Sequence, residues 1–103
     1  MNLFAGENLM DSAAFDAIVR GRVQHVGFRY YACSEAERLG VKGWIRNKPM
    51  GEVEVRAEGE PENLKKFLSW LHKGPPNGRV DSVNISWREP CGTYRGFAVD
   101  YDR

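Results

Sequence analysis

The segment between residues 24 and 29, QHVGFR, places a glycine and an arginine where a strand pattern changes to a helix pattern. The first backbone N–H groups of a helix have no internal partner and carry the positive end of the helix dipole. Gly27 lets the backbone approach a ligand closely, and Arg29 adds a planar cation that matches two phosphate oxygens. These features suit a phosphate or carboxylate, but a plain strand-to-helix turn with a solvated arginine has the same local sequence.

Asn47 is a second candidate functional residue, because it ends the strand pattern VKGWIRN (41–47) directly before a turn. Its amide oxygen can accept a hydrogen bond from a water molecule, and its NH₂ group can hold a neighbouring acceptor. Asparagine is also common in turns, so its position alone favours a structural role. Pro49 and Gly51 predict that this turn closes a β-hairpin.

Two segments have the periodicity of helices. Residues 30–39, YYACSEAERL, predict a short helix that ends at Gly40. In residues 61–73 the apolar side chains recur at the spacing i, i+3, i+4, i+7, and Pro61 suits the first helical position. Both segments should therefore cover a sheet with one apolar face.

Five segments alternate apolar and polar residues, as half-buried strands do: 15–23, 41–47, 52–59, 80–89 and 96–101. With the helices, the order is strand, helix, strand, strand, helix, strand, followed by a short last strand. This order predicts an α+β fold, the ferredoxin-like sandwich, with two helices on one face of an antiparallel sheet. The fold hosts enzymes, metal carriers and RNA-binding proteins, so it does not indicate a function.

The chain has 103 residues, which suits one domain, and its 15 basic and 14 acidic residues give a net charge of +1. Such a balance disfavours a nucleic-acid partner. Cys33, Cys91, His25 and His72 form no metal-ligand spacing, so we expect no metal and reduced thiols.

No apolar stretch approaches the roughly 20 residues that span a membrane, and the N-terminus lacks the features of a signal peptide. We therefore expect a cytoplasmic monomer without a membrane partner. Residues 1–14 are predicted to be a flexible extension, and residues 15–103 to form the domain.

Three segments together resemble the acylphosphatase family. VQHVGFR (23–29) resembles the family signature G-x-V-Q-G-V-x-F-R, which closes the first strand and opens the first helix. GWIRNKPMGEVEV (43–55) is similar to the second signature, and GFAVDY (96–101) resembles the final motif. The spacing agrees from about residue 15 to 101. One position departs, since His25 stands where the family usually has glycine. If φ is positive there, histidine costs more than glycine.

The resemblance implies an enzyme that hydrolyses acyl phosphates to a carboxylate and inorganic phosphate without a metal ion or other cofactor. Arg29 falls on the family's phosphate-binding arginine, and Asn47 on its water-orienting asparagine. The backbone N–H groups that fall on the phosphate cradle belong to His25, Val26, Gly27, Phe28 and Arg29. The implied partners are a small-molecule acyl phosphate and, in the loop, inorganic phosphate or other anions.

The remaining side chains of this region have expected structural roles. Gln24 should close the loop through side-chain hydrogen bonds, and Phe28 should be buried in the core. The imidazole of His25 is expected to take no part in catalysis, because the family mechanism does not require a histidine. Trp44 and Trp87 are expected in the core or on a sheet face rather than against the substrate.

Two other function classes compete with hydrolysis. An RNA-binding domain of this fold would present aromatic and basic residues on its open sheet face, whereas the 52–59 strand presents Glu54, Arg56 and Glu58. A non-catalytic module that binds an anion would keep Arg29 but would have no use for a water-orienting Asn47. A metal-carrying domain is disfavoured, since the chain has no CxxC motif.

Overall fold

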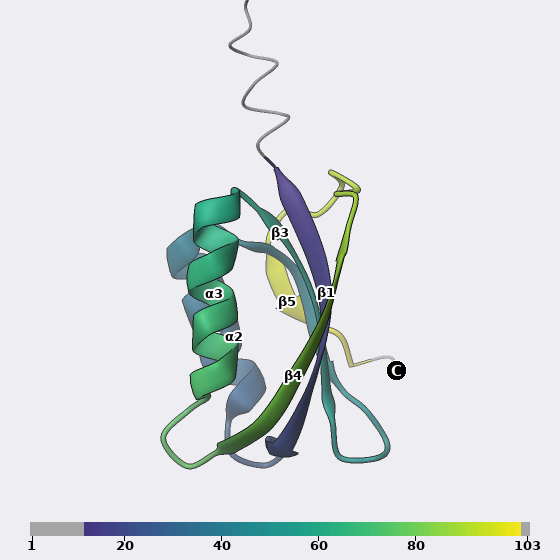
Figure 1. The fold of residues 1–103 in the computed structure, drawn as a ribbon. Coiled ribbons are helices and arrows are strands. Elements are labelled where there is room, and N and C mark those ends of the chain that lie inside the picture. Colours follow the sequence, from purple (N-terminus) through teal and green to yellow (C-terminus); the bar gives the residue numbers. More distant parts are fainter. Residues whose placement is uncertain (1–11, 102–103) are drawn as a thin grey trace, which may run out of the picture.

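The computed structural model describes residues 12–101. Within that range the chain forms an α+β sandwich in which both helices lie on one side of a single sheet (Figure 1). In chain order the elements are β1 (Ala13–Arg22), α2 (Phe28–Leu39), β2 (Lys42–Asn47), β3 (Val53–Gly59), α3 (Pro61–Lys73), β4 (Arg79–Arg88) and β5 (Phe97–Val99). The predicted ferredoxin-like fold is confirmed.

The strands lie in the order β4-β1-β3-β2-β5, and the first four pair antiparallel. The last pair departs from the antiparallel sheet that we expected, because β5 runs parallel to β2, with Gly43 opposite Phe97 and Ile45 opposite Val99. β4 ends at the end of the sheet where β2 begins, so a direct connection to the far edge must enter β5 in the direction of β2. Residues 89–96 make that connection, and eight extended residues, with a reach of about 26 Å, can cross four strand spacings of about 4.8 Å.

The core lies between the helices and the sheet. α3 buries Leu64, Phe67 and Leu71, which are all on the predicted stripe. Every second residue of the two central strands faces the same core; these are Phe15, Ala17 and Val19 in β1 and Val53, Val55 and Ala57 in β3. The period-two and period-3.6 patterns of the sequence therefore converge on one apolar layer.

Two boundaries differ from the prediction. α2 begins at Phe28 rather than Tyr30, so Arg29 lies in its first turn. β1 begins at Ala13, and the buried Ala14 pairs with both β3 and β4, so residues 13 and 14 belong to the domain and not to the predicted extension. Residues 1–11 of that extension lie outside the described residues.

Glu58 was expected on the open face of the sheet with Glu54 and Arg56, but it is only 8% exposed. Its carboxylate accepts hydrogen bonds from the N–H groups of Cys91 (2.7 Å) and Gly92 (3.1 Å), in the connection that crosses to β5. Burial by itself raises the pKa of this carboxyl, but the two N–H donors, the Cys91 side chain and the charge of Arg56 together hold the pKa below its usual value. In the described part of the chain, neither helix is long and apolar enough to cross a membrane.

Candidate active site

The loop between β1 and α2 leaves a row of backbone donors without protein partners. Among residues 12–101, no N–H group from His25 to Tyr30 donates to a protein acceptor; the first that does is Tyr31, whose N–H donates to Gly27 O at 3.0 Å. No side chain caps α2, and Gly27 at the N-cap is left-handed, with φ 79°. Unpaired donors at a helix N-terminus attract an anion.

His25 also has a left-handed backbone, with φ 65°, and it is the one residue other than glycine with positive φ among the described residues. The alternative that the sequence left open is thereby resolved. Histidine occupies a conformation that a glycine adopts without strain, and it is among the side chains that tolerate it best. Its side chain is exposed and lines the site.

Arg29 and Asn47 line the same pocket, of about 310 Å³, although they come from different elements. Arg29 projects from the first turn of α2, and its guanidinium lies over the ring of Tyr101, 5.4 Å from the ring centroid. None of the salt bridges within residues 12–101 involves Arg29. Its positive charge is therefore not neutralised by a carboxylate of that part of the chain.

Tyr101 is a site residue that the sequence reasoning did not assign. It is the last residue of the GFAVDY segment and lies two residues beyond the end of β5. It reaches Arg29 because β5 pairs with β2 at the edge of the sheet. The final aromatic residue of that segment was the available signal, but nothing in its spacing indicated a contact with Arg29.

Asn47 is the last residue of β2, and its side-chain oxygen Oδ1 is buried without a hydrogen bond from any described residue. A buried acceptor that lacks a donor costs about 1–3 kcal/mol. A water molecule in the pocket would remove that cost by donating to Oδ1. The position is therefore suited to holding water against a ligand.

Gln24 connects the loop to the hairpin that carries Asn47. Its Nε2 donates to Lys48 O and to Glu52 O, both at 2.8 Å. The hairpin is closed by its own bonds, Lys48 N to Glu52 O (2.8 Å) and Gly51 N to Lys48 O (3.1 Å). The expected side-chain hydrogen bonds of Gln24 are confirmed, and they join the loop to the hairpin that follows Asn47.

The pocket collects most of the predicted site residues. His25, Gly27, Phe28, Arg29 and Asn47 line it, whereas the side chain of Val26 packs against the core. Phe28 is buried, as expected, and its ring packs edge-on against Trp70 at 5.3 Å.

Cys33 also lines the pocket, from the second turn of α2. Burial raises the pKa of its thiol, and the positive charge of Arg29 offsets that effect only in part. Little thiolate is therefore present at neutral pH, which disfavours Cys33 as a nucleophile.

The pocket thus brings unpaired N–H donors and Arg29 beside the buried, unpaired oxygen of Asn47. A family model described as acylphosphatase matches residues 15–99. The chain belongs to the acylphosphatase family. It is 49% identical to an acylphosphatase from Thermococcus kodakarensis (strain ATCC BAA-918 / JCM 12380 / KOD1), over 79% of this chain and 88% of that protein. It is 46% identical to one from Anaeromyxobacter dehalogenans (strain 2CP-C), over 82% of this chain and 90% of that protein.

A solved acylphosphatase structure from Coxiella burnetii has the same fold. It superposes with a TM-score of 0.85 at 32% identity, covering 91% of this chain and 98% of that one. The resemblance seen in the three sequence segments is thereby confirmed over nearly the whole described range. The chain is an enzyme of the acylphosphatase family, whose members hydrolyse acyl phosphates.

Proposed function

We propose that this chain hydrolyses acyl phosphates to a carboxylate and inorganic phosphate without a metal ion, with the phosphoryl group held at the N-terminus of α2. The observation that carries the proposal is the convergence on one pocket of unpaired N–H donors, a cation without a carboxylate partner and a buried acceptor without a donor. A phosphoryl group with an attacking water would supply acceptors to the N–H donors and the cation, and a donor to the buried oxygen.

The first half of the mechanism is charge stabilisation. Phosphoryl transfer passes through a loose transition state with its charge spread over the equatorial oxygens. The N–H groups of residues 25–29 and the guanidinium of Arg29 donate to those oxygens. Because the donors are already oriented in the loop, no reorganisation is required at the moment of reaction. This is the contribution that a metal ion makes in many other phosphoryl-transfer enzymes.

The second half is the placement of the attacking water. Asn47 Oδ1 accepts a hydrogen bond from that water and holds it in line with the leaving carboxylate. An amide is a poor base, so the proton of the water passes to a phosphate oxygen of the substrate. The leaving carboxylate of an acyl phosphate needs little acid catalysis, so no histidine or acidic residue is required.

The wider setting is part of the same proposal. We place the enzyme in the cytoplasm as a monomer that binds inorganic phosphate or other anions in the same loop. The free thiols of Cys33 and Cys91 support a reducing compartment, and the net charge of +1 supports a small-molecule substrate rather than a nucleic acid. Size-exclusion chromatography with light scattering tests the monomer, and a dimer would contradict it.

Hydrolysis of a simple aromatic acyl phosphate in excess chelator tests the function. Wild type should turn over at the same rate with and without chelator. Arg29→Ala should lose at least about 10³-fold, as charge-stabilising arginines do elsewhere, and Arg29→Lys should recover little, because a point charge does not replace the planar fork. Arg38→Ala is the matched control, since Arg38 is exposed on the same helix and, among residues 12–101, forms a salt bridge with Glu35 alone.

Asn47→Ala separates the two halves of the mechanism. It should lose rate but still bind inorganic phosphate, which is measured by calorimetry. Loss of phosphate affinity as severe as in Arg29→Ala would make Asn47 a ligand of the phosphate. Near-normal turnover in Arg29→Ala would overturn the assignment of Arg29.

A further inference from the structure

His25 has a backbone conformation that usually belongs to glycine. Its φ of 65° is the one positive value at a residue other than glycine between residues 12 and 101. A side chain in this conformation costs free energy that glycine does not cost, and such residues gather at ligand-binding sites. The proposed mechanism uses only the N–H group of His25, so it gives the imidazole no role.

The imidazole lies at the site without a protein partner. Among residues 12–101, His25 forms no side-chain hydrogen bond and no salt bridge. It is exposed and lines the pocket of Arg29 and Asn47. Its own N–H begins the donor row, so in any rotamer the ring stays within about 8 Å of an anion held there, which is roughly one Debye length at 0.15 M salt.

His25 is also the residue of the pocket whose charge can change near neutral pH. The other ionisable side chains that line the pocket are Arg29, Tyr30, Cys33 and Tyr101, and none of the described lining residues has a carboxylate. Of these residue types, histidine alone ordinarily changes charge between pH 5 and 8. Protonation of His25 therefore adds a positive charge to a pocket whose other groups keep theirs.

The segments around the pocket carry charges that do not titrate in this range. At the end of β1, in the hairpin and beyond β5 the charged side chains are Arg20, Arg22, Lys48, Glu52 and Asp100. Glu52 pairs with Arg20 at 2.8 Å, and Asp100 lies 3.7 Å from Arg46. Carboxylates, lysines and arginines ordinarily keep their charge between pH 5.5 and 7.5.

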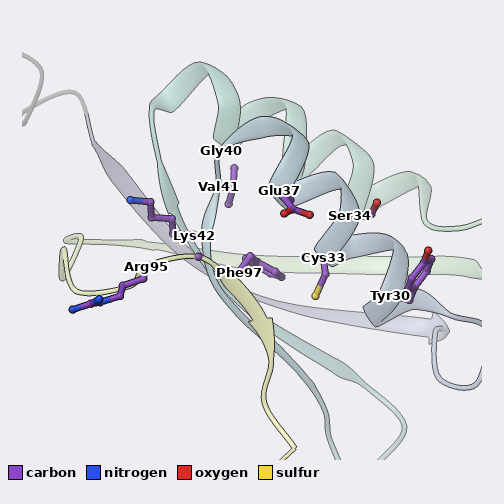
Figure 2. Close-up of a pocket in the computed structure, with 10 residues that line it drawn as sticks. Tyr30, Cys33, Ser34, Glu37, Gly40, Val41, Lys42, Arg95 and Phe97 are labelled. Carbon is purple, nitrogen blue, oxygen red and sulfur yellow. The ribbon is translucent and has the colours of Figure 1, made fainter.

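The groove along α2 holds the remaining charged groups beside the pocket. It is a space of about 580 Å³ between α2 and β5, and Figure 2 shows Tyr30 at one end of it and Lys42 and Arg95 at the opposite end. Glu37 lies between these ends, on α2. These charges are also of types that do not ordinarily titrate between pH 5.5 and 7.5.

We propose that the imidazole of His25 is a further binding group for the anionic substrate, and that its protonated form adds a second cation beside Arg29. The enzyme then binds the phosphoryl group more tightly as the pH falls from 7.5 to 5.5, because the protonated ring attracts the dianion and the neutral ring does not. The inference rests on the proposed function for the position of the anion.

The expected size of the effect follows from Coulomb's law. A unit charge about 7 Å from a dianion, at an effective dielectric constant of about 40–80, changes the affinity about three- to tenfold at an ionic strength of about 0.05 M. Screening should reduce the change to roughly two- to threefold at about 0.3 M. Because the charge acts on the substrate and the transition state alike, it should lower KM and leave kcat little changed.

The affinity for sulfate at pH 5.5 and pH 7.5, measured by calorimetry, tests this role of His25. Sulfate is a dianion at both pH values, whereas phosphoryl groups gain a proton in this range. At an ionic strength of about 0.05 M, wild type should bind sulfate about three- to tenfold more tightly at pH 5.5. In His25→Gln and in His25→Gly the ratio of the two affinities should fall close to one. The ratio is compared within each variant, so a change in absolute affinity does not affect the result.

His72→Gln is the matched control. His72 is the other histidine of the chain, lies in the last turn of α3 and does not line the pocket. This variant should keep the wild-type ratio. Loss of the ratio in His72→Gln, or its persistence in His25→Gln, would refute the assignment of His25.

Two further results separate this inference from the proposed function. If no acyl phosphate is hydrolysed but sulfate behaves as expected, the assignment of His25 stands and the hydrolytic function fails. If acyl phosphates are hydrolysed and wild type binds sulfate equally at both pH values, the hydrolytic function stands and the assignment of His25 is wrong.

Discussion

Replacement of Gln24 tests whether the loop and the Asn47 hairpin act as one unit. The side chain donates two 2.8 Å hydrogen bonds from a single nitrogen to Lys48 O and Glu52 O. No other hydrogen bond joins the loop to this hairpin among the described residues. Gln24→Ala should therefore release the hairpin from the loop while both keep their own local structure.

The cost of Gln24→Ala in folding free energy depends on the hydrogen bonds that the two carbonyl acceptors keep. Two lost hydrogen bonds are worth about 0.5–1.5 kcal/mol each. Neither carbonyl is left without a partner, because Lys48 O still accepts from Gly51 N and Glu52 O from Lys48 N. The added penalty for an unsatisfied buried group therefore does not apply. We expect Gln24→Ala to lower the free energy of unfolding by about 1–3 kcal/mol, or roughly 4–24 °C in Tm for a domain of this size.

Gln24→Glu is the sharper variant. Above its pKa, the introduced glutamate side chain has only acceptor oxygens. These oxygens would face the carbonyl oxygens of Lys48 and Glu52 with no hydrogen between them. Gln24→Glu should be less stable than Gln24→Ala at pH 7, and protonation of that carboxyl should narrow the difference as the pH falls towards 4. Urea unfolding at pH 7 and pH 4 measures both effects. Equal stability of the two variants at pH 7 would refute the bridging role of Gln24.

The same variants should affect catalysis unequally. Since the donor row remains intact, phosphate affinity should change little. In the proposed mechanism the attacking water is held by Asn47, directly before the hairpin turn, and a displacement near 1 Å can cost up to about 100-fold in rate. We therefore expect kcat to fall about 10- to 100-fold in Gln24→Ala. A fall in phosphate affinity without a fall in kcat would show that Gln24 supports the loop alone.

Three further changes have outcomes that the structure predicts. Gly43→Ala would bring Cβ within 1.9 Å of Arg56 O at a φ of 139°, so it should lower the free energy of unfolding by at least about 3 kcal/mol. Gly40→Ala, with open space around it, should lower it by only about 1 kcal/mol. Equal Tm losses in the two variants would contradict this difference. Asp16→Asn should cost about 1 kcal/mol at pH 7. Burial tends to raise the pKa of Asp16, but Arg56 and Arg88 lower it overall. The stability that the Asp16 carboxylate contributes is therefore present above about pH 4 and should disappear as the pH falls below that. A stability difference between wild type and Asp16→Asn that persists in urea at pH 2 would argue against these ion pairs as its cause. His25→Gly should leave the free energy of unfolding within about 1 kcal/mol of wild type, because the loss of backbone strain at φ 65° offsets the greater entropy of glycine in the unfolded chain. His25→Val should lower it by about 2 kcal/mol, since a β-branched residue tolerates positive φ poorly. Similar urea midpoints for the two variants would contradict the left-handed backbone.

The sequence by itself predicted the elements whose signals are local. The stripe of α3 depends on residues within two turns of one another, and the alternation in β1 and β3 requires only one wet and one buried face. The resemblance in segments 23–29 and 43–55 indicated Arg29 and Asn47 together, although 18 residues separate them. Periodic patterns can be recognised in a sequence because they depend only on residues close together in the chain.

Only the tertiary structure decided the features that depend on which segments meet. Alternation placed Glu58 on the open face, but the connection to β5 crosses there and buries it. The backbone angle of His25, the bridge from Gln24 to the hairpin and the approach of Tyr101 to Arg29 all depend on contacts between segments distant in the chain. The groove along α2 exists because β5, the last strand, pairs parallel to β2 at the sheet edge beneath that helix. Their physical origin is the pairing of strands across the sheet, which the period of any single segment does not encode.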